Sequence, residues 1–391
     1  MPRHLLHSIL SLLLCLLVTS VTAEKIQVPF YSENILIEFD EDIRLSTPVK
    51  VKEKIMIQYY RDLLKTNFHT LLENLEAKRV EFKLNDWLFF ELLRTSVDHI
   101  LDGQSRLRKE LTYWFLLSES GYDTRLTFLG THTYLYVFTT DELFEVPMIE
   151  ENERTFVNLT SIQSHSKPKK ALYLLEFIPR PNGKAFGFYL NQLPELRPKL
   201  VKKKYQFNYN NQPYQLSLKV DQTIKEIMEN YPFFAEKEYL EVPFSSTLNN
   251  SLLPQFSALI AGRSKQEALE LLVAFTRSSF QYKDDKEFFG KSKPMIADEV
   301  FHYEFSDCED RSALFYSLVK SLLDLPMVVV AFPDHLTIAV AVPEQQSGDH
   351  LIFNNRKYFF CDPTGPVNST TIGKIPSGYE NTPFEIISAY K

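Results

Sequence analysis

Apolar residues recur at helical spacing in several long segments of the chain. In the segment 265–278, Ala268, Leu271, Leu272 and Phe275 share one face of a helix. The same spacing predicts further helices over residues 51–75, 87–101 and 105–118. These segments indicate that helices make up a large part of the fold.

Other segments alternate between apolar and polar residues or form short β-branched runs, and both patterns are typical of strands. Strands are predicted at residues 26–28, 35–37, 126–137, 327–332, 335–342 and 357–361. Between residues 161 and 214 the chain is rich in Pro, Asn and Lys, with extended pieces at 171–178, 185–190 and 204–209. We therefore expect an α+β fold with an N-terminal α+β domain over 24–160, a β-rich middle region over 161–238 and a C-terminal domain over 239–391.

The N-terminus has the pattern of a signal peptide. Arg3 precedes an apolar run over residues 10–18, and Val21-Thr22-Ala23 fits a signal peptidase site. The run is too short to span a bilayer. We expect segment 1–23 to be removed and the protein to be exported, either to a periplasm or outside the cell, without a membrane span in the mature chain.

The composition is that of a globular protein, with 44% hydrophobic and 24% charged residues in a chain of 391. Without segment 1–23 the chain carries 42 basic and 50 acidic residues, a balance of −8 that argues against non-specific nucleic-acid binding. The sequence contains no glycine-rich nucleotide loop and no standard zinc motif. We expect no metal and no cofactor, and the sequence does not indicate an oligomeric state.

Cys308 stands in the run Phe305-Ser306-Asp307-Cys308-Glu309-Asp310-Arg311, directly before an apolar pattern at helical spacing. It is therefore predicted to start a buried helix. A helix N-terminus favours a thiolate, whereas three neighbouring carboxylates oppose it. A nearby imidazolium is needed if this thiol is to ionise.

Two later residues could complete a catalytic site with Cys308. His335 opens a predicted strand, and Asp362 directly follows the next predicted strand, 357–361. Adjacent strands could bring His335 beside the helix start and Asp362 against the far nitrogen of its ring. This is the arrangement of a nucleophile, a base and a residue that orients the base.

The three motifs together resemble the transglutaminase-like superfamily. They are D-C-E-D-R-S at 307–312, P-D-H-L at 333–336 and Y-F-F-C-D-P-T at 358–364, within a region of resemblance over about 265–370. The resemblance implies a papain-like C-terminal domain with a Cys308–His335–Asp362 triad, of a type found in secreted bacterial proteins. It implies acyl transfer through a thioester, by hydrolysis of peptide or amide bonds or by transfer to an amine, with a peptide or protein as substrate. Some members have lost the triad and only bind, so a silent binding or scaffolding protein is the alternative.

Each candidate residue also has a purely structural interpretation. Cys308 could be a core thiol, His335 a strand residue bonded to a carbonyl, and Asp362 a turn former before Pro363. Cys361 is expected to be structural, on the strand face opposite Asp362. A Cys308–Cys361 disulfide would disable the nucleophile.

The N-terminal half has the outline of a second, degenerate copy. An offset of 203 places Ser105 on Cys308 and His132 on His335, and six of 33 positions are identical between 105–137 and 308–340. Asn158 lies within one position of the place expected for the counterpart of Asp362. Chance similarity between two α+β segments is the competing interpretation. A working Ser105–His132 pair is disfavoured because a hydroxyl needs a stronger base than a thiol does.

Overall fold

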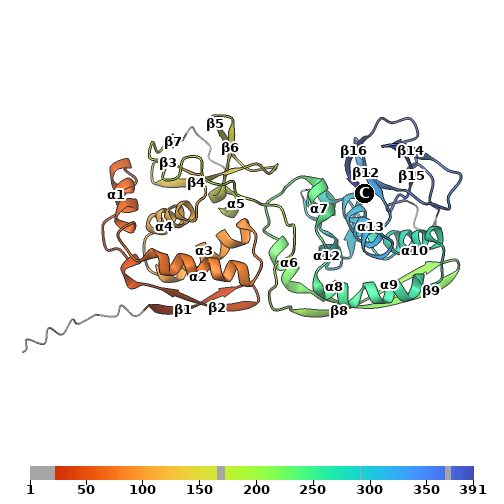
Figure 1. The fold of residues 1–391 in the computed structure, drawn as a ribbon, viewed down its shortest axis with the longest axis horizontal. Helices are drawn as coiled ribbons and strands as arrows, with labels where there is room; N and C mark the ends of the chain where they lie inside the picture. The colour runs from red at the N-terminus through yellow and green to blue at the C-terminus, as the bar shows by residue number, and fades with distance from the viewer. Residues whose placement is uncertain (1–22, 165–171, 291, 366–370) are drawn as a thin grey trace, which may run out of the picture.

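The computed structural model describes residues 23–164, 172–290, 292–365 and 371–391. The predicted signal segment therefore lies outside the described residues, apart from Ala23. The fold is mixed α+β and forms two lobes side by side (Figure 1). No helix in the described part of the chain has the length and apolar character needed to cross a membrane.

The N-terminal lobe consists of a hairpin, four main helices and a five-stranded sheet. Its elements are β1 (Glu24–Phe30), β2 (Glu33–Phe39), the 3-10 helix η1 (Glu41–Ile43), α1 (Glu53–Leu63), α2 (Phe68–Glu81), α3 (Asp86–Ile100), α4 (Arg106–Glu119), β3 (Thr124–Leu129), β4 (His132–Thr139), β5 (Met148–Glu151), β6 (Arg154–Asn158), α5 (Leu159–Ser164) and β7 (Tyr173–Leu174).

The C-terminal lobe has the same plan with more helices. Its elements are β8 (Leu200–Tyr209), β9 (Gln212–Asp221), α6 (Gln222–Met228), α7 (Glu236–Glu241), α8 (Ser246–Ser251), α9 (Leu253–Ile260), α10 (Lys265–Ser278), β10 (Gln281–Tyr282), α11 (Asp285–Phe288), α12 (Ala297–Val300), β11 (Phe305–Ser306), α13 (Cys308–Leu322), β12 (Met327–Phe332), β13 (His335–Val340), β14 (His350–Phe353), β15 (Arg356–Phe360) and β16 (Glu385–Tyr390).

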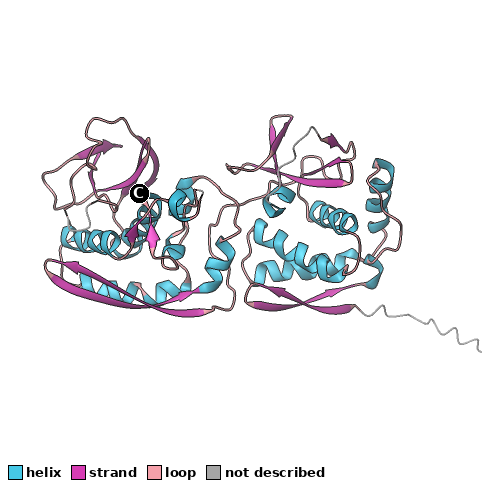
Figure 2. Ribbon diagram, turned by 180° about the vertical axis from the view of Figure 1, so that it is seen from behind, coloured by secondary structure: helices cyan, strands magenta, loops and turns pink. Residues whose placement is uncertain are grey.

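Each lobe has three layers. A long hairpin lies along one edge, helices occupy the middle, and a curled sheet lies on the far side, as both views show (Figures 1 and 2). The two sheets have equivalent strand orders, β5-β6-β4-β3-β7 and β14-β15-β13-β12-β16. In the N-terminal lobe α4 is followed directly by the antiparallel pair β3 and β4, and in the C-terminal lobe α13 is followed directly by the antiparallel pair β12 and β13.

The strand registers of the two sheets also correspond. Thr124 lies opposite Val137 in β3 and β4, and Met327 lies opposite Val340 in β12 and β13. One offset, 203, relates both pairs. The offset becomes 202 for β5 and β6, because the interval from Val340 to His350 is one residue shorter than the equivalent interval from Val137 to Met148.

The expected middle region contributes to both lobes. Its strand β7 joins the N-terminal sheet, whereas the hairpin of β8 and β9 packs on α10 and α8 in the C-terminal lobe. The piece 185–190 was expected to be extended and forms no strand. Its backbone makes hydrogen bonds to side chains instead. For example, the backbone N–H of Phe188 donates to the Asp141 carboxylate.

The predicted helix over 51–75 is wrong in one respect, because the chain forms two helices there. Helix α1 ends at Leu63, and the hydroxyl of Thr66 bonds the carbonyl of Leu63 before α2 begins at Phe68. The apolar spacing continues through the break, so periodicity alone did not reveal it.

The two lobes share part of their hydrophobic core. Ile224, Met228, Phe234 and Val242 belong by sequence to the region around α6 and α7, yet they pack into the core of the N-terminal lobe. The backbone of Phe144 also bonds that of Phe233. The lobes are therefore packed against each other as well as linked by the chain.

Candidate active site

Cys308 is the first residue of α13, as the sequence predicts. Asp307 is the N-cap and exchanges capping-box hydrogen bonds with Asp310. The body of the helix is buried between the β13 side of the sheet and the remaining helices, so its start is rigidly placed. The Ser312 hydroxyl adds a bond to the carbonyl of Leu336, which ties α13 to β13.

The Cys308 thiol is 6% exposed and donates a hydrogen bond to Glu309, with Sγ 2.8 Å from Oε2. Burial raises the pKa of Cys308, and the charge of Glu309 raises it further. The backbone N–H of Leu336 acts in the opposite direction, because it favours the thiolate. The sulfur therefore adjoins the strand residue that directly follows His335, and its resting form is the protonated thiol.

His335 and Asp362 are in direct contact. The ring Nε2 lies 3.2 Å from the Asp362 carboxylate, and both side chains are about nine-tenths buried. The hydroxyl of Thr337 and the backbone N–H of Thr364 also donate to this carboxylate. Burial alone would raise the pKa of Asp362, but the hydrogen bond and charge of His335 outweigh it, and the pKa lies below its usual value. Asp362 is thus held as an anion against the ring.

Two buried arginines hold the loop that carries Asp362. Arg277, at the end of α10, donates from Nε and Nη2 to the Asp362 carbonyl. Arg311, on α13, donates to the carbonyls of Thr364 and Phe280. A Cβ at Gly365 would lie 2.8 Å from Arg277 Nη2, so a larger residue there would have to displace the Arg277 guanidinium. The backbone after β15 is therefore fixed from several sides.

An aromatic pair covers the imidazole of His335. The Tyr379 ring stacks on it at 5.3 Å between centroids and 23° between planes, and Phe332 stacks on it at 6.5 Å and 26°. The Tyr379 hydroxyl donates to Asp334, 2.8 Å away. Tyr379 therefore pins the segment before β16 over the histidine.

The structure brings His335 and Asp362 together and places Cys308 against the same strand. The sequence identified Glu309 only as an unfavourable charge, and the structure makes it the direct partner of the thiol. Arg277 and Tyr379 were missed altogether. Arg277 carries no motif, and Tyr379 comes from a late loop whose position depends on the pairing of β16 with β12.

Cys361 lies in the hydrophobic core, and its sulfur contacts the carbonyl of Phe359. Burial raises its pKa to about 12. Both Cys308 and Cys361 are free thiols, so the disulfide considered from the sequence is not formed.

A cluster of buried carboxylates lies behind the helix start. Within the described residues, Asp285, Asp307 and Asp310 place oxygen atoms within 4.8 Å of one another. Burial raises the pKa of Asp285 to about 7, and that of Asp310 well above its usual value. Backbone N–H groups of Lys293 and Met295 donate to Asp285 and Asp310. Protonation and these hydrogen bonds offset the repulsion within the cluster.

The N-terminal lobe has no comparable triad at the corresponding positions. Ser105 is the N-cap of α4, and its hydroxyl accepts the N–H of Arg108, while His132 is exposed. The register places Asn158 opposite Tyr136, as Phe360 is opposite Ala339, so Asn158 does not correspond to Asp362. Thr160 occupies that place instead, because the offset there is 202.

No family model, curated protein or solved structure matches this chain. The chemistry of the site therefore has to be argued from its own geometry.

Proposed function

We propose that the C-terminal lobe is a cysteine-dependent acyl-transfer enzyme of the transglutaminase-like type, with a papain-like core. The observation that carries this proposal is the buried contact, 3.2 Å long, between His335 and Asp362. Leu336, the residue after His335 on β13, adjoins the Cys308 sulfur. A buried carboxylate that orients an imidazole beside a thiol at a helix start is the arrangement required for nucleophilic catalysis.

In the proposed reaction, Asp362 binds Nε2 of His335, which leaves Nδ1 to take the thiol proton. The sulfur of Cys308 attacks the amide carbonyl, and the C–N bond breaks as the imidazolium gives its proton to the leaving amine. Water, or an amine, then attacks the thioester, His335 takes the proton of that nucleophile, and the C–S bond breaks as the proton is returned to the sulfur. The N–H of Cys308 at the helix start is the proposed oxyanion donor.

We further propose that the N-terminal lobe is a degenerate duplicate. Equal strand order, equal register and the shared offset of 203 through the central strand pair support it. In this view the first copy kept the fold and lost the thiol, with Ser105 serving as a helix cap.

One observation favours a second candidate, a silent binding or scaffolding protein. The thiol donates to Glu309, and burial together with that carboxylate raises its pKa. A cysteine kept protonated in this way would be a poor nucleophile.

The rate at which iodoacetamide alkylates Cys308 in the full chain distinguishes the two. If His335 takes the thiol proton, His335→Gln lowers this rate at neutral pH by tenfold or more, because the thiolate loses its counter-charge. His350→Gln, on the exposed end of β14, is the matched control and leaves the rate unchanged. Equal rates in all three proteins contradict the enzyme and favour the binding protein.

Turnover is tested separately with casein hydrolysis and with incorporation of a fluorescent primary amine into casein. Loss of either activity in Cys308→Ala, with unchanged circular dichroism, supports the proposal. Activity that persists in this variant refutes it.

A further inference from the structure

A pocket of about 770 Å³ lies at the junction of the two lobes. Three separate parts of the chain line it, namely residues 142–145 in the loop before β5, residues 233–237 at the start of α7 and residues 385–387 at the start of β16. Figure 1 shows α7 on the side of the C-terminal lobe that is next to the N-terminal lobe. The volume is within the range of pockets that hold ligands.

The walls of this pocket are held in place by the fold. The backbone N–H of Phe144 donates to the carbonyl of Phe233, and the N–H of Ala235 donates to the carbonyl of Glu142, so the first two segments form one wall. The third segment belongs to β16, the last strand of its sheet, and no other described strand pairs with its outer side. The backbone groups on that side are therefore available to an extended chain.

The charges of the pocket are almost all negative. Glu142, Glu145, Glu236 and Glu385 line it, and Lys237 is the one cation among its lining residues. Within the part of the chain that the structure describes, none of these four carboxylates makes a hydrogen bond or an ion pair. A ligand with positive charge would therefore meet carboxylates that have no other partner.

The surroundings of Glu236 show that the pocket lacks a cation. Partial burial raises the pKa of this carboxyl, and the charge of Asp307 raises it further, whereas no cation acts in the opposite direction. The nearby Lys237 lies 3.7 Å from Glu238, a residue outside the lining of the pocket. A bound ammonium or guanidinium group would offset this repulsion.

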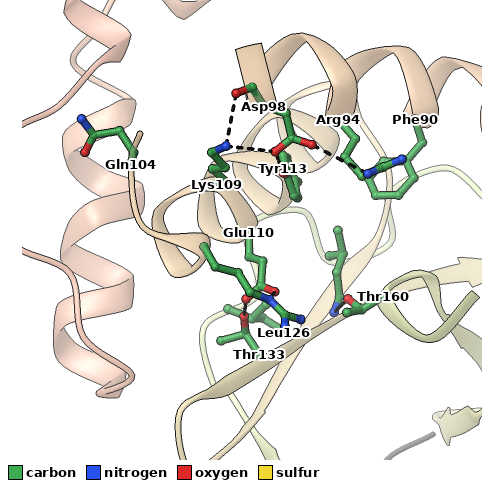
Figure 3. Close-up of a pocket in the computed structure, with 12 residues that line it drawn as sticks. Phe90, Arg94, Asp98, Gln104, Lys109, Glu110, Tyr113, Leu126, Thr133 and Thr160 are labelled. Atoms are coloured by element: carbon green, nitrogen blue, oxygen red, sulfur yellow. Dashed lines mark hydrogen bonds and ion pairs between the residues drawn. The ribbon is translucent and has the colours of Figure 1, made fainter. Parts of the chain in front are cut away.

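The charged pocket between α3 and α4 is a useful contrast (Figure 3). There, the Nε of Arg106 donates to Glu110 at 2.6 Å, and Arg94 donates to Glu91 at 3.2 Å. Figure 3 also shows Asp98 joined to Arg94 by a dashed line. The charges in that pocket satisfy one another, whereas the pocket at the lobe junction gathers charges of one sign.

Apolar surface lies beside the carboxylates at the junction. The rings of Phe144 and Phe233 are 5.3 Å apart, and Phe144 is 39% exposed. Ile386 and Ile387 add aliphatic surface from β16. Lysine and arginine side chains combine an apolar stem with a charged head, and their heads are attracted to aromatic faces as well as to carboxylates. The pocket therefore has the chemistry that suits these two side chains.

We propose that this pocket binds an extended basic peptide, whose lysine or arginine side chain enters the pocket while its backbone pairs with the free edge of β16. The charge complementarity and the unpaired strand edge are separate observations that select the same ligand. The binding does not depend on the chemistry proposed for Cys308.

The position of the pocket relates it to the candidate active site. Glu385 lies opposite Ala331 in the sheet, and the next residue, Phe332, stacks on the ring of His335. Phe384 also contacts Phe332, with 5.6 Å between ring centroids. The peptide therefore binds at the end of the sheet that carries His335.

The test uses a six-residue peptide of alternating valine and arginine, acetylated and amidated at its ends. It is compared by calorimetric titration with the same peptide carrying citrulline, which has nearly the shape of arginine and no charge. The protein is the full chain with Cys308→Ala, so that turnover cannot consume the probe. The arginine peptide is expected to bind once per chain, and the citrulline peptide at least tenfold more weakly. Added salt weakens binding of the arginine peptide.

Strand pairing is tested with two further peptides, each N-methylated at alternate residues so that one edge of the extended chain loses its donors. One of the two is expected to bind at least tenfold more weakly, because it blocks the edge that faces β16. Undiminished binding of both overturns the pairing with β16.

The double variant Glu145→Gln with Glu385→Gln is expected to weaken binding of the arginine peptide at least tenfold. The control is Glu153→Gln with Glu344→Gln, which also removes one exposed carboxylate from each lobe and leaves the pocket intact. Equal affinity for the arginine and citrulline peptides overturns the proposal, and so does equal weakening in both double variants, which would show attraction to net charge alone. Since the probe binds a chain without the thiol, failure here leaves the enzyme proposal to its own alkylation and turnover tests.

Discussion

The contact between Cys308 and Glu309 leads to a prediction opposite to what loss of a site residue usually causes. Glu309→Gln keeps the size of the side chain and an oxygen that can accept the hydrogen bond from the thiol. It removes a negative charge 2.8 Å from the sulfur. A negative neighbour disfavours the thiolate, so its removal lowers the pKa of Cys308. The variant should therefore be alkylated faster than the native protein.

The size of the effect follows from Coulomb's law. Two unit charges 2.8 Å apart interact by about 1.5 kcal/mol at the permittivity of water, and several-fold more at the effective permittivity of a protein site. About 1.4 kcal/mol corresponds to tenfold in the thiolate population. We expect Glu309→Gln to raise the alkylation rate at pH 8 by at least about tenfold. Burial and Asp307 raise the pKa of Glu309 to about 7, so the difference should shrink below pH 7 as the native Glu309 becomes neutral.

The assay measures iodoacetamide labelling of Cys308 by peptide mass spectrometry between pH 6 and pH 9. Cys361, fully buried in the core, is an internal reference that reports opening of the fold. Glu304→Gln, an exposed change shortly before the same helix, is the matched control and should have no effect. A rate in Glu309→Gln that equals or falls below the native rate at pH 8 would refute the reasoning and would favour Glu309 as the group that takes the thiol proton.

Two further substitutions test the surroundings of the site. Gly365→Ala places a Cβ 2.8 Å from Arg277 and 3.2 Å from the Asp362 carboxylate, so it should cost about 1–3 kcal/mol in urea unfolding and slow the labelling of Cys308; an unchanged midpoint and rate would contradict the packing described. Asp298 is buried and accepts a hydrogen bond from the backbone N–H of Ser245, and burial raises its pKa to about 7. Its contribution to the stability of the fold is therefore complete below about pH 4 and is lost as the pH rises towards 7. Asp298→Asn should therefore raise the free energy of unfolding at pH 8 by up to about 4 kcal/mol relative to the native chain, and raise the melting temperature with it, with little gain at pH 4. An equal gain in melting temperature at both pH values would show that the carboxyl is not protonated in the fold.

The elements that carry local signals were the ones predicted well from the sequence. Helix α10 spans the predicted residues, because Ser264 and Glu267 form a capping box at its start and the apolar face is continuous. Strand β12 was predicted with its observed bounds, because a short β-branched run between a helix and a turn is typical of a buried strand. The break between α1 and α2 was missed because the turn there, in which both the backbone N–H and the hydroxyl of Thr66 bond the carbonyl of Leu63, leaves the apolar periodicity intact.

The candidate site divides in the same way. The contact of His335 with Asp362 could be predicted because both follow from the order of strands along the chain. The orientation of the Cys308 thiol could not, since it depends on side-chain rotamers at the helix start. The register that assigns Thr160, and not Asn158, to the place of Asp362 depends on a single residue in a loop, which a sequence with six identities in 33 does not resolve.

The core that the lobes share bears on how the molecule melts. Ile224, Phe234 and Val242 fill the interior of the first lobe although they follow the hairpin of the second. Separating the halves would strip apolar side chains from one of them and expose them to water, which costs free energy roughly in proportion to the area uncovered. Calorimetry should accordingly record one cooperative heat-absorption peak, and a chain cut before β8 should yield a first half that precipitates.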